Sequence, residues 1–330
     1  MIPLTKSQNK WGFACGRVSA LTGRLMPCEF FLSLAALERT DDLFHRLQDT
    51  SLREHMVPGA VSWEDWSTII DTCVHELVVS IRRDCPNPAL ADLYTLSEDY
   101  LNLKRAVLGR TPFPFPAALF QEARLVEVAS GNPSLLPDVI RPAVAQLSGM
   151  GASAQDAVVA DMVLDGAYLR HYLTLAAAVE APLVLFWARE RVLSRAVVAL
   201  WRASRMGRPL KGFQQYLLPL EDLTGILSDI IAVNDRRAWA GLLPGRIGDL
   251  FRESLEAPEE EQVARFEHIS ANYLTDLARG TKLQTAGPER VAGFLWGLWT
   301  EAFNLKLVIS GKLNRIEADA LRARVRDTYV

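Results

Sequence analysis

Residues 291–312 read VAGFLWGLWTEAFNLKLVISGK. Apolar side chains occupy most of these positions, so the pattern predicts one long helix that is buried on nearly all sides. A single polar turn interrupts it in the middle, Glu301-Ala-Phe-Asn304, and Leu305-Lys306 follow directly. A charged and an amide side chain inside such an apolar helix need partners from elsewhere in the chain.

A very similar turn lies far upstream, where Asp99-Tyr-Leu-Asn102 is followed by Leu103-Lys104. A degraded third copy lies between the two, at Glu180-Ala-Pro-Leu183, with leucines in the places of the asparagine and the lysine. The intervals between the copies are too uneven for a short-period solenoid. They predict an internally repeated helical protein with three elaborated units.

Each complete turn places an acid and an asparagine on one helix face, because residues three apart are neighbours there and can support each other. We expect the buried asparagine to bond a backbone group of an adjacent helix, since an unpaired amide is costly. No His, Ser or Cys accompanies the pair, so the turn predicts a structural clamp rather than a catalytic site. The residues of this repeat motif are Asp99, Asn102, Lys104, Glu180, Glu301, Asn304 and Lys306.

The apolar residues of the whole chain follow helical periods, and no two short alternating runs are joined by Asn-Gly or Asp-Gly. The sequence therefore predicts an all-α fold, with a last helix over residues 316–329. Three prolines in 110–116 and the Gly/Pro-rich stretch 206–212 predict two unit boundaries. The expected units are 1–110, 111–205 and 206–330.

Hydrophobic residues make up 49% of the chain and the formal net charge is −3, so the molecule as a whole has no basic field for nucleic acid. The most apolar run, 172–188, contains Glu180 and Pro182, which argue against a membrane span. The first residues lack the apolar core of a secretory signal. We therefore expect a cytoplasmic chain whose four cysteines are free thiols, without zinc.

One charged segment stands out, because residues 189–211 contain seven Lys and Arg side chains and the single acid Glu190. Apolar residues alternate with the arginines in an amphipathic pattern. Two interpretations stay open for it: a solvated helix face, or a docking surface for an acidic protein or lipid headgroups.

An enzyme is the alternative hypothesis. Asp41-Asp42-Leu-Phe-His45 resembles the start of the first magnesium motif of class I isoprenoid synthases, which are all-α enzymes, and Asn234-Asp235 resembles the start of their second motif. His45, Ala238 and Leu242 stand where that family has metal ligands, so too few oxygen ligands remain for a magnesium cluster.

No phosphate-binding loop of the Walker type is present either, and we expect no cofactor. The short run Ser310-Gly-Lys312 indicates a helix end instead, with a glycine and a cation at the carboxyl terminus of the helix.

The repeated acid-x-x-Asn-Leu-Lys turn and its surroundings resemble the C subunit of bacterial and archaeal V-type (A-type) ATPases, the counterpart of the d subunit of eukaryotic vacuolar enzymes. Trp11-Gly-Phe-Ala-Cys-Gly-Arg17 is similar to that family's opening helix. The turns at Asp99 and Glu301, and Ile309-Ser-Gly-Lys-Leu-Asn314 after the second, match its order of motifs. Pro182 and Leu183 depart from the family pattern in the middle unit.

The resemblance implies a pseudo-threefold funnel of three helical units with no active site. It also implies a place within the complex: on the cytoplasmic side of the membrane, between the proteolipid ring and the central-stalk subunits, held by protein contacts. There the chain would couple ATP hydrolysis or synthesis to ion transport. The coupling ion, proton or sodium, and the direction of the reaction are left open by this sequence.

Overall fold

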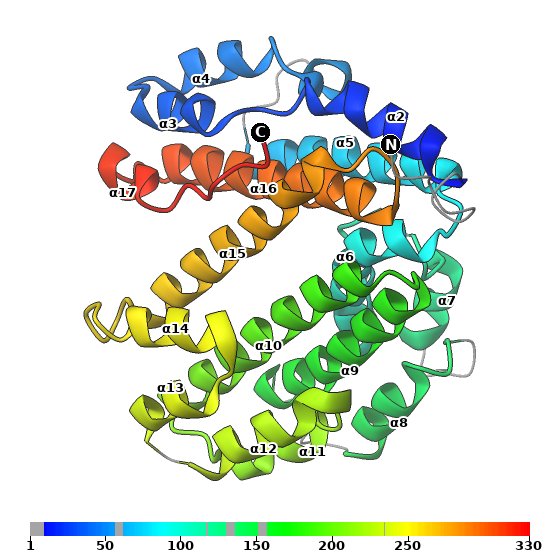
Figure 1. Cartoon of the computed structure of the whole chain (residues 1–330), viewed down its shortest axis with the longest axis vertical. Helices are drawn as coiled ribbons and strands as arrows, with labels where there is room; N and C mark the ends of the chain where they lie inside the picture. The colour runs from blue at the N-terminus through cyan, green and yellow to red at the C-terminus, as the bar shows by residue number, and fades with distance from the viewer. Residues whose placement is uncertain (1–9, 57–61, 117, 130–135, 151–156, 234) are drawn as a thin grey trace. The chain divides into compact units, whose positions relative to one another are not determined.

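A computed structural model describes residues 10–56, 62–116, 118–129, 136–150, 157–233 and 235–330 of the chain (Figure 1). The described residues form α-helices and short 3-10 helices and contain no β-strand, so the predicted all-α class is confirmed. None of these helices is both long and apolar enough to cross a bilayer.

Contacts within the chain divide it into two compact units. Unit 1 comprises residues 1–95, 114–116 and 275–330, and unit 2 comprises 96–113 and 117–274. The division falls inside two long helices, α6 (Ala89–Val107) and α15 (Gln262–Gly280). The pseudo-threefold arrangement of three repeated units, 1–110, 111–205 and 206–330, stays a prediction.

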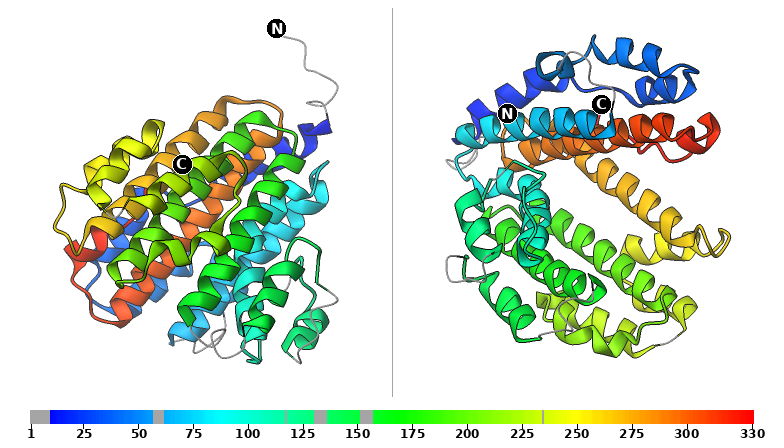
Figure 2. Two further views of the ribbon diagram at one scale, coloured as in Figure 1. Left: turned by 90° about the horizontal axis from the view of Figure 1, so that it is seen from below. Right: turned by 180° about the vertical axis from the view of Figure 1, so that it is seen from behind.

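Unit 1 is organised around α16 (Pro288–Leu313), the helix from which the sequence analysis started. It lies beside α5 (Trp63–Asp84), and this pairing can be followed in Figures 1 and 2. Its other neighbours are α2 (Gly12–Thr22), α3 (Cys28–Ala36), η7 (Thr281–Leu283) and α17 (Ala318–Arg322). The unit also contains α4 (Thr40–Leu47) and η1 (Ser51–His55).

Local sequence signals explain where the two central helices of unit 1 begin. Ser62 caps α5: its hydroxyl accepts from the Asp65 N–H, and the Asp65 carboxylate accepts from the Ser62 N–H, which is a capping box. Pro288 occupies the first turn of α16, where its missing N–H costs nothing. At the other end of α5, Arg82 forms an ion pair with Asp92 of α6.

The core of unit 1 lies between these helices and buries large side chains completely. Trp66 of α5 stacks on Phe44 of α4 with ring centroids 4.7 Å apart, and Phe31 of α3 is fully buried in the same cluster. Leu305 and Ile309 bring α16 into it as well. Close packing of this kind has low compressibility and resists deformation.

Unit 2 is organised around the pair α9 (Ala157–Ala178) and α10 (Pro182–Arg205). Trp201 of α10 lies 4.6 Å from Phe251 and 6.1 Å from Phe266, measured between ring centroids, in a second aromatic core. The smaller helices of the unit are α7 (Glu122–Ala129), α8 (Arg141–Gly149), η4 (Leu210–Gly212), α11 (Gln214–Leu217), η5 (Glu221–Leu223), α12 (Thr224–Ala232), η6 (Arg236–Ala238), α13 (Trp239–Leu242) and α14 (Gly245–Ser254).

Two expectations about the C-terminal region are wrong. The helix predicted over 316–329 covers only Ala318–Arg322, because the backbone groups of Arg326 bond to a side chain of α16 instead of to a helical turn. Gly311 does not end α16. It lies in the last turn, where a Cβ would clash with the side chain of Leu321. The helix ends at Leu313 with Lys312 in its last turn, so the predicted helix end and its cation are confirmed, and only the terminal position of the glycine is wrong.

Candidate functional site

The polar turn of α16 holds separate segments of unit 1. Glu301 is 6% exposed, and its Oε2 accepts a hydrogen bond of 2.6 Å from the backbone N–H of Met26, in the loop between α2 and α3. Lys306 forms an ion pair with Asp71 of α5, and its Nζ lies 5.7 Å from the centre of the Phe115 ring. The turn therefore joins α16 both to α5 and to the loop that leads into α3.

Asn304, in the same turn, is completely buried and bonds the backbone of one residue twice. Its Nδ2 donates to the carbonyl oxygen of Arg326, and its Oδ1 accepts from the N–H of Arg326, both at 2.9 Å. Glu301 and Asn304 thus share a helix face but bind different segments of the chain.

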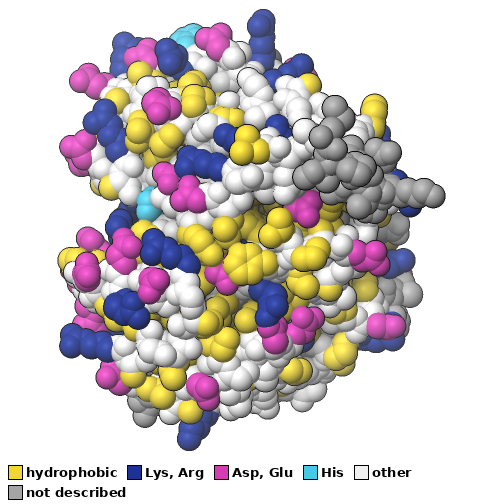
Figure 3. Space-filling view, viewed as in Figure 1, with side chains coloured by type: hydrophobic (Ala, Val, Ile, Leu, Met, Phe, Trp, Pro, Cys, Tyr) yellow, Lys and Arg dark blue, Asp and Glu magenta, His cyan; other side chains and the backbone are white. Residues whose placement is uncertain are grey.

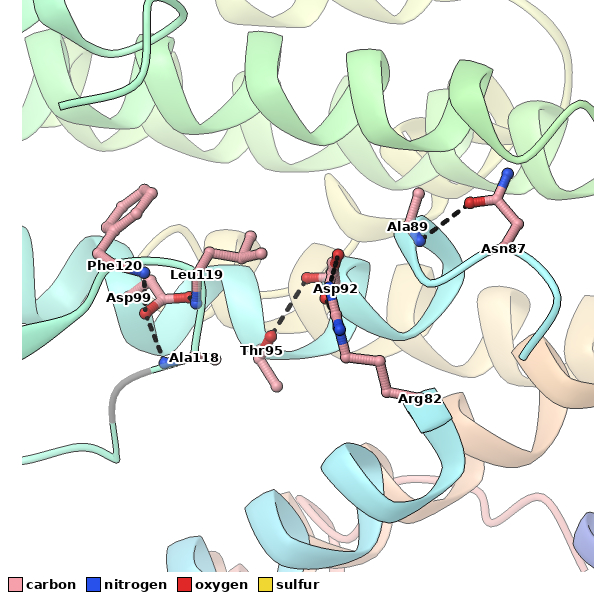
Figure 4. Close-up of polar contacts among 9 residues, drawn as sticks. All are labelled: Arg82, Asn87, Ala89, Asp92, Thr95, Asp99, Ala118, Leu119 and Phe120. Atoms are coloured by element: carbon pink, nitrogen blue, oxygen red, sulfur yellow. Dashed lines mark hydrogen bonds and ion pairs between the residues drawn. The ribbon is translucent and has the colours of Figure 1, made fainter. Parts of the chain in front are cut away.

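The corresponding turn of α6 makes the same kinds of contact in unit 2. Asp99 is completely buried, and its carboxylate accepts from the backbone N–H groups of Ala118, Leu119 and Phe120 at 3.1, 3.0 and 3.3 Å (Figure 4). Three amide donors are well suited to stabilise a carboxylate that is removed from water. Asn102 is also completely buried.

Lys104 completes the turn of α6. Its Nζ lies 2.9 Å from a carboxylate oxygen of both Asp161 and Asp165, on α9. Burial lowers the pKa of Lys104, but the two carboxylates outweigh burial and raise the pKa above its ordinary value. In both turns, then, the acid binds backbone N–H groups of an incoming segment and the lysine pairs with an aspartate of a long helix.

The middle position looks different. Glu180 is exposed and lies between α9 and α10 with a φ of 58°, while Pro182 begins α10 and Leu183 is 55% exposed. The buried polar side chains of α10 are Arg191 and Ser194, further along the helix. Whether Glu180 belongs to a third copy of the motif stays a prediction.

Arg191 corrects the interpretation of the basic segment 189–211 as a continuous exposed face. It is 3% exposed, donates to the Tyr172 hydroxyl at 3.0 Å, and its Cζ lies 4.9 Å from the centre of the Tyr172 ring and 5.6 Å from that of Trp187. Aromatic faces therefore stabilise this buried cation.

Other arginines of the segment pair with acids of unit 2. Arg189 pairs with Asp222, and Arg202 approaches Glu267 to 2.6 Å. Basic and acidic side chains are interspersed over the face of the molecule in Figure 3. These two ion pairs neutralise part of the charge of the segment within the chain.

The residues of the enzyme hypothesis lie in different units of the chain, Asp41 and Asp42 in unit 1 and Asp235 in unit 2. Asp41 and Asp42 are in the first turn of α4, and Asn234 lies outside the described residues. In the described part of the chain no group of three or more His, Cys, Asp or Glu side chains is arranged to hold a metal ion. The four cysteines are free thiols.

The sequence analysis missed the aspartates that pair with the lysines of the turns. Asp71 follows Ile69-Ile70 and Asp165 follows Val163-Leu164, each near the middle of a long helix. Asp71 is 7% exposed and interrupts the buried face of α5, whereas the side chain of Asp165 is 40% exposed. This repeated step from aliphatic residues to an aspartate was the signal that could have revealed them.

Comparison with known proteins identifies the family of the chain. A model of the ATP synthase (C/AC39) subunit family matches residues 14–324. A search of curated proteins finds no match. The family model spans both complete polar turns, and it confirms the resemblance inferred from them. The chain belongs to the ATP synthase (C/AC39) subunit family, a family of V/A-type ATPase subunits.

Proposed function

We propose that this chain is the non-catalytic connector between the central stalk and the proteolipid ring of a rotary V/A-type ATPase. In this role it transmits rotation, so that ATP hydrolysis or synthesis in one part of the complex is coupled to proton or sodium transport in the other. The observation that carries the proposal is the family match over residues 14–324.

The polar turns support a mechanical role. A part that transmits torque must keep its helices in register, and each complete turn binds one helix to other segments through buried hydrogen bonds of its acid and an ion pair of its lysine that is partly exposed. Lys306 holds α5 and Lys104 holds α9, while Glu301 and Asp99 hold backbone amides of a loop. Buried polar groups of this kind are costly to separate, so they oppose sliding of the helices.

The proposal places the chain at the cytoplasmic face of the membrane, held there by its protein partners. It also retains the funnel of three similar units as the architecture that would surround the end of the stalk.

Deletion of the chain in its own host, followed by complementation, tests the proposal. Membranes with the tagged chain should yield a proteolipid and stalk subunits on affinity purification, and vesicles from them should take up ions when ATP and magnesium are added. Vesicles without the chain should lose ATP-driven ion uptake. Complementation with the unaltered gene should restore it.

Two results would contradict this function. One is recovery of the tagged chain without ATPase subunits. The other is ATP-driven ion uptake that is unchanged by the deletion.

A further inference from the structure

The contact between Glu301 and Met26 differs from its counterpart at Asp99. Asp99 accepts three backbone N–H groups, whereas among the described residues the hydrogen bond to Glu301 comes from the N–H of Met26 alone. The two groups of this bond lie in a closed interior, since Met26 is 5% exposed and Glu301 is 6% exposed. A single donor compensates poorly for the loss of water around a charged carboxylate.

The surroundings of Glu301 offer it little positive charge. Lys306 is paired with Asp71, and the guanidinium of Arg326 lies 3.4 Å from the centre of the Phe303 ring. In the described part of the chain, Glu301 takes part in no ion pair. The other titratable or charged groups near it on the surrounding elements have both signs: Arg24 in the loop itself, Asp71, Cys73, His75 and Glu76 on α5, Cys28 and Glu29 on α3, and Arg324, Arg326 and Asp327 after α17. Burial and the Met26 N–H, rather than any of these charges, account for the shift in the pKa of Glu301.

Burial raises the pKa of Glu301 to about 8, and the Met26 N–H lowers this pKa only in part. Glu301 also affects a thiol on α5. Burial is the larger cause that raises the pKa of Cys73 to about 11, and the Glu301 carboxylate is the next. The apolar surroundings therefore favour the neutral acid, and the single donor, which favours the ionised form, offsets this preference only in part.

We propose that Glu301 is a proton-dependent latch, which in its neutral form holds the loop between α2 and α3 against α16 and releases that loop when it ionises. The physical reason is the cost of a buried charge. Once the proton is lost, the Met26 N–H binds the carboxylate more strongly, but one donor does not replace its hydration, so water must reach it. Among the described residues the loop that carries Met26 forms no ion pair, so we assign the opening to this loop.

The direction of the pH effect follows from the two states. The folded chain keeps the Glu301 proton up to about pH 8, whereas the unfolded chain loses it near the ordinary value of 4.5. The stabilisation is complete below 4.5, declines as the pH rises and is absent above about 8. One proton changes the folding equilibrium by up to about tenfold per pH unit in that window.

The first measurement is amide hydrogen exchange of Met26 in the full chain between pH 6 and 9, corrected for the intrinsic exchange rate. We expect the protection of this amide to fall as the pH rises towards 8 and beyond. In Glu301→Gln, which imitates the neutral acid, protection should stay constant. Glu64→Gln changes an exposed residue of α5 and should behave like the unaltered chain.

The second measurement is infrared absorption of protonated carboxyl groups at pH 7. Burial also raises the pKa of Glu190, so the contribution of Glu301 is isolated in Glu190→Gln, where the band should persist, and it should be absent from the double variant Glu190→Gln/Glu301→Gln. If Glu301→Gln does not fold, Glu190→Gln alone tests the proposal, because the carboxyl band of this variant must disappear as the pH rises through about 8. Absence of the band at pH 7, or pH-independent protection of Met26 in the unaltered chain, would overturn the proposal.

Discussion

The side chain of Asn304 forms a two-bond pair with the backbone of Arg326, at 2.9 Å in each direction. The amide side chain has one group that donates and one that accepts, so it can bond both the C=O and the N–H of a single residue. It therefore holds the residues around Arg326 against α16 in a non-helical conformation. The path of the last segment of the chain depends on this side chain.

Asn304→Leu should lower the free energy of unfolding by about 2–4 kcal/mol, since it leaves a backbone N–H and a C=O without their partner. We expect the Tm, followed by circular dichroism at 222 nm, to fall by several degrees. Asn314→Leu is the control, because Asn314 is exposed and its side chain bonds Ser310 of its own helix. Equal Tm values for the two variants would show that the pair with Arg326 is not what stabilises this region.

Asp99→Asn should loosen the segment that follows Ala117. The new amide group has one acceptor oxygen where the carboxylate had two, so it cannot satisfy all three backbone donors of Ala118–Phe120. We expect a loss of about 1–3 kcal/mol in stability and faster hydrogen exchange of these three amides. Asp138→Asn alters an aspartate whose side chain is 90% exposed and should leave their exchange unchanged.

Much of the fold was predictable because the responsible signals are local. Ser62 and the acids that follow it indicated the start of α5, and the apolar run 291–312 indicated α16, which extends over Pro288–Leu313. The resemblance carried by the two complete turns indicated the family. These features depend on residues that are close together in the sequence.

The partners of the turns could not be predicted in the same way. Glu301 bonds the backbone N–H of Met26, which is 275 positions away, and a backbone amide has no residue type by which to recognise it. Arg191 looked exposed because arginine usually is, but the faces of Tyr172 and Trp187 make a buried position acceptable. Tertiary contacts decided both cases.

The ion pair between Lys306 and Asp71 should contribute measurable coupling between α16 and α5. Their side chains are 27% and 10% exposed, so solvent screens them less than a surface pair. In a double-mutant cycle with Lys306→Met and Asp71→Asn, we expect a coupling free energy of about 0.5–3 kcal/mol.

The same cycle on Arg322 and Asp319, whose side chains are 45% and 94% exposed, should give a value near zero. A coupling between Lys306 and Asp71 as small as that of the surface pair would refute the role of Lys306 as a link between the helices.

Gly297→Ala should destabilise unit 1 because the C-terminal segment packs directly on this glycine. A Cβ at position 297 would lie 2.5 Å from the Cβ of Tyr329, whose side chain is buried, with 1% of the residue exposed. We expect a loss of about 1–3 kcal/mol, seen as a lower urea midpoint with an unchanged m-value.

Gly16→Ala is the matched control for Gly297→Ala, since no heavy atom lies within 4 Å of its added Cβ in α2. Alanine there should stabilise the helix by up to about 1 kcal/mol. A raised midpoint in both variants would mean that Tyr329 does not pack on α16 in solution. The hold of Asn304 on Arg326 would then be in question as well, because both contacts fix the same C-terminal segment to the same helix.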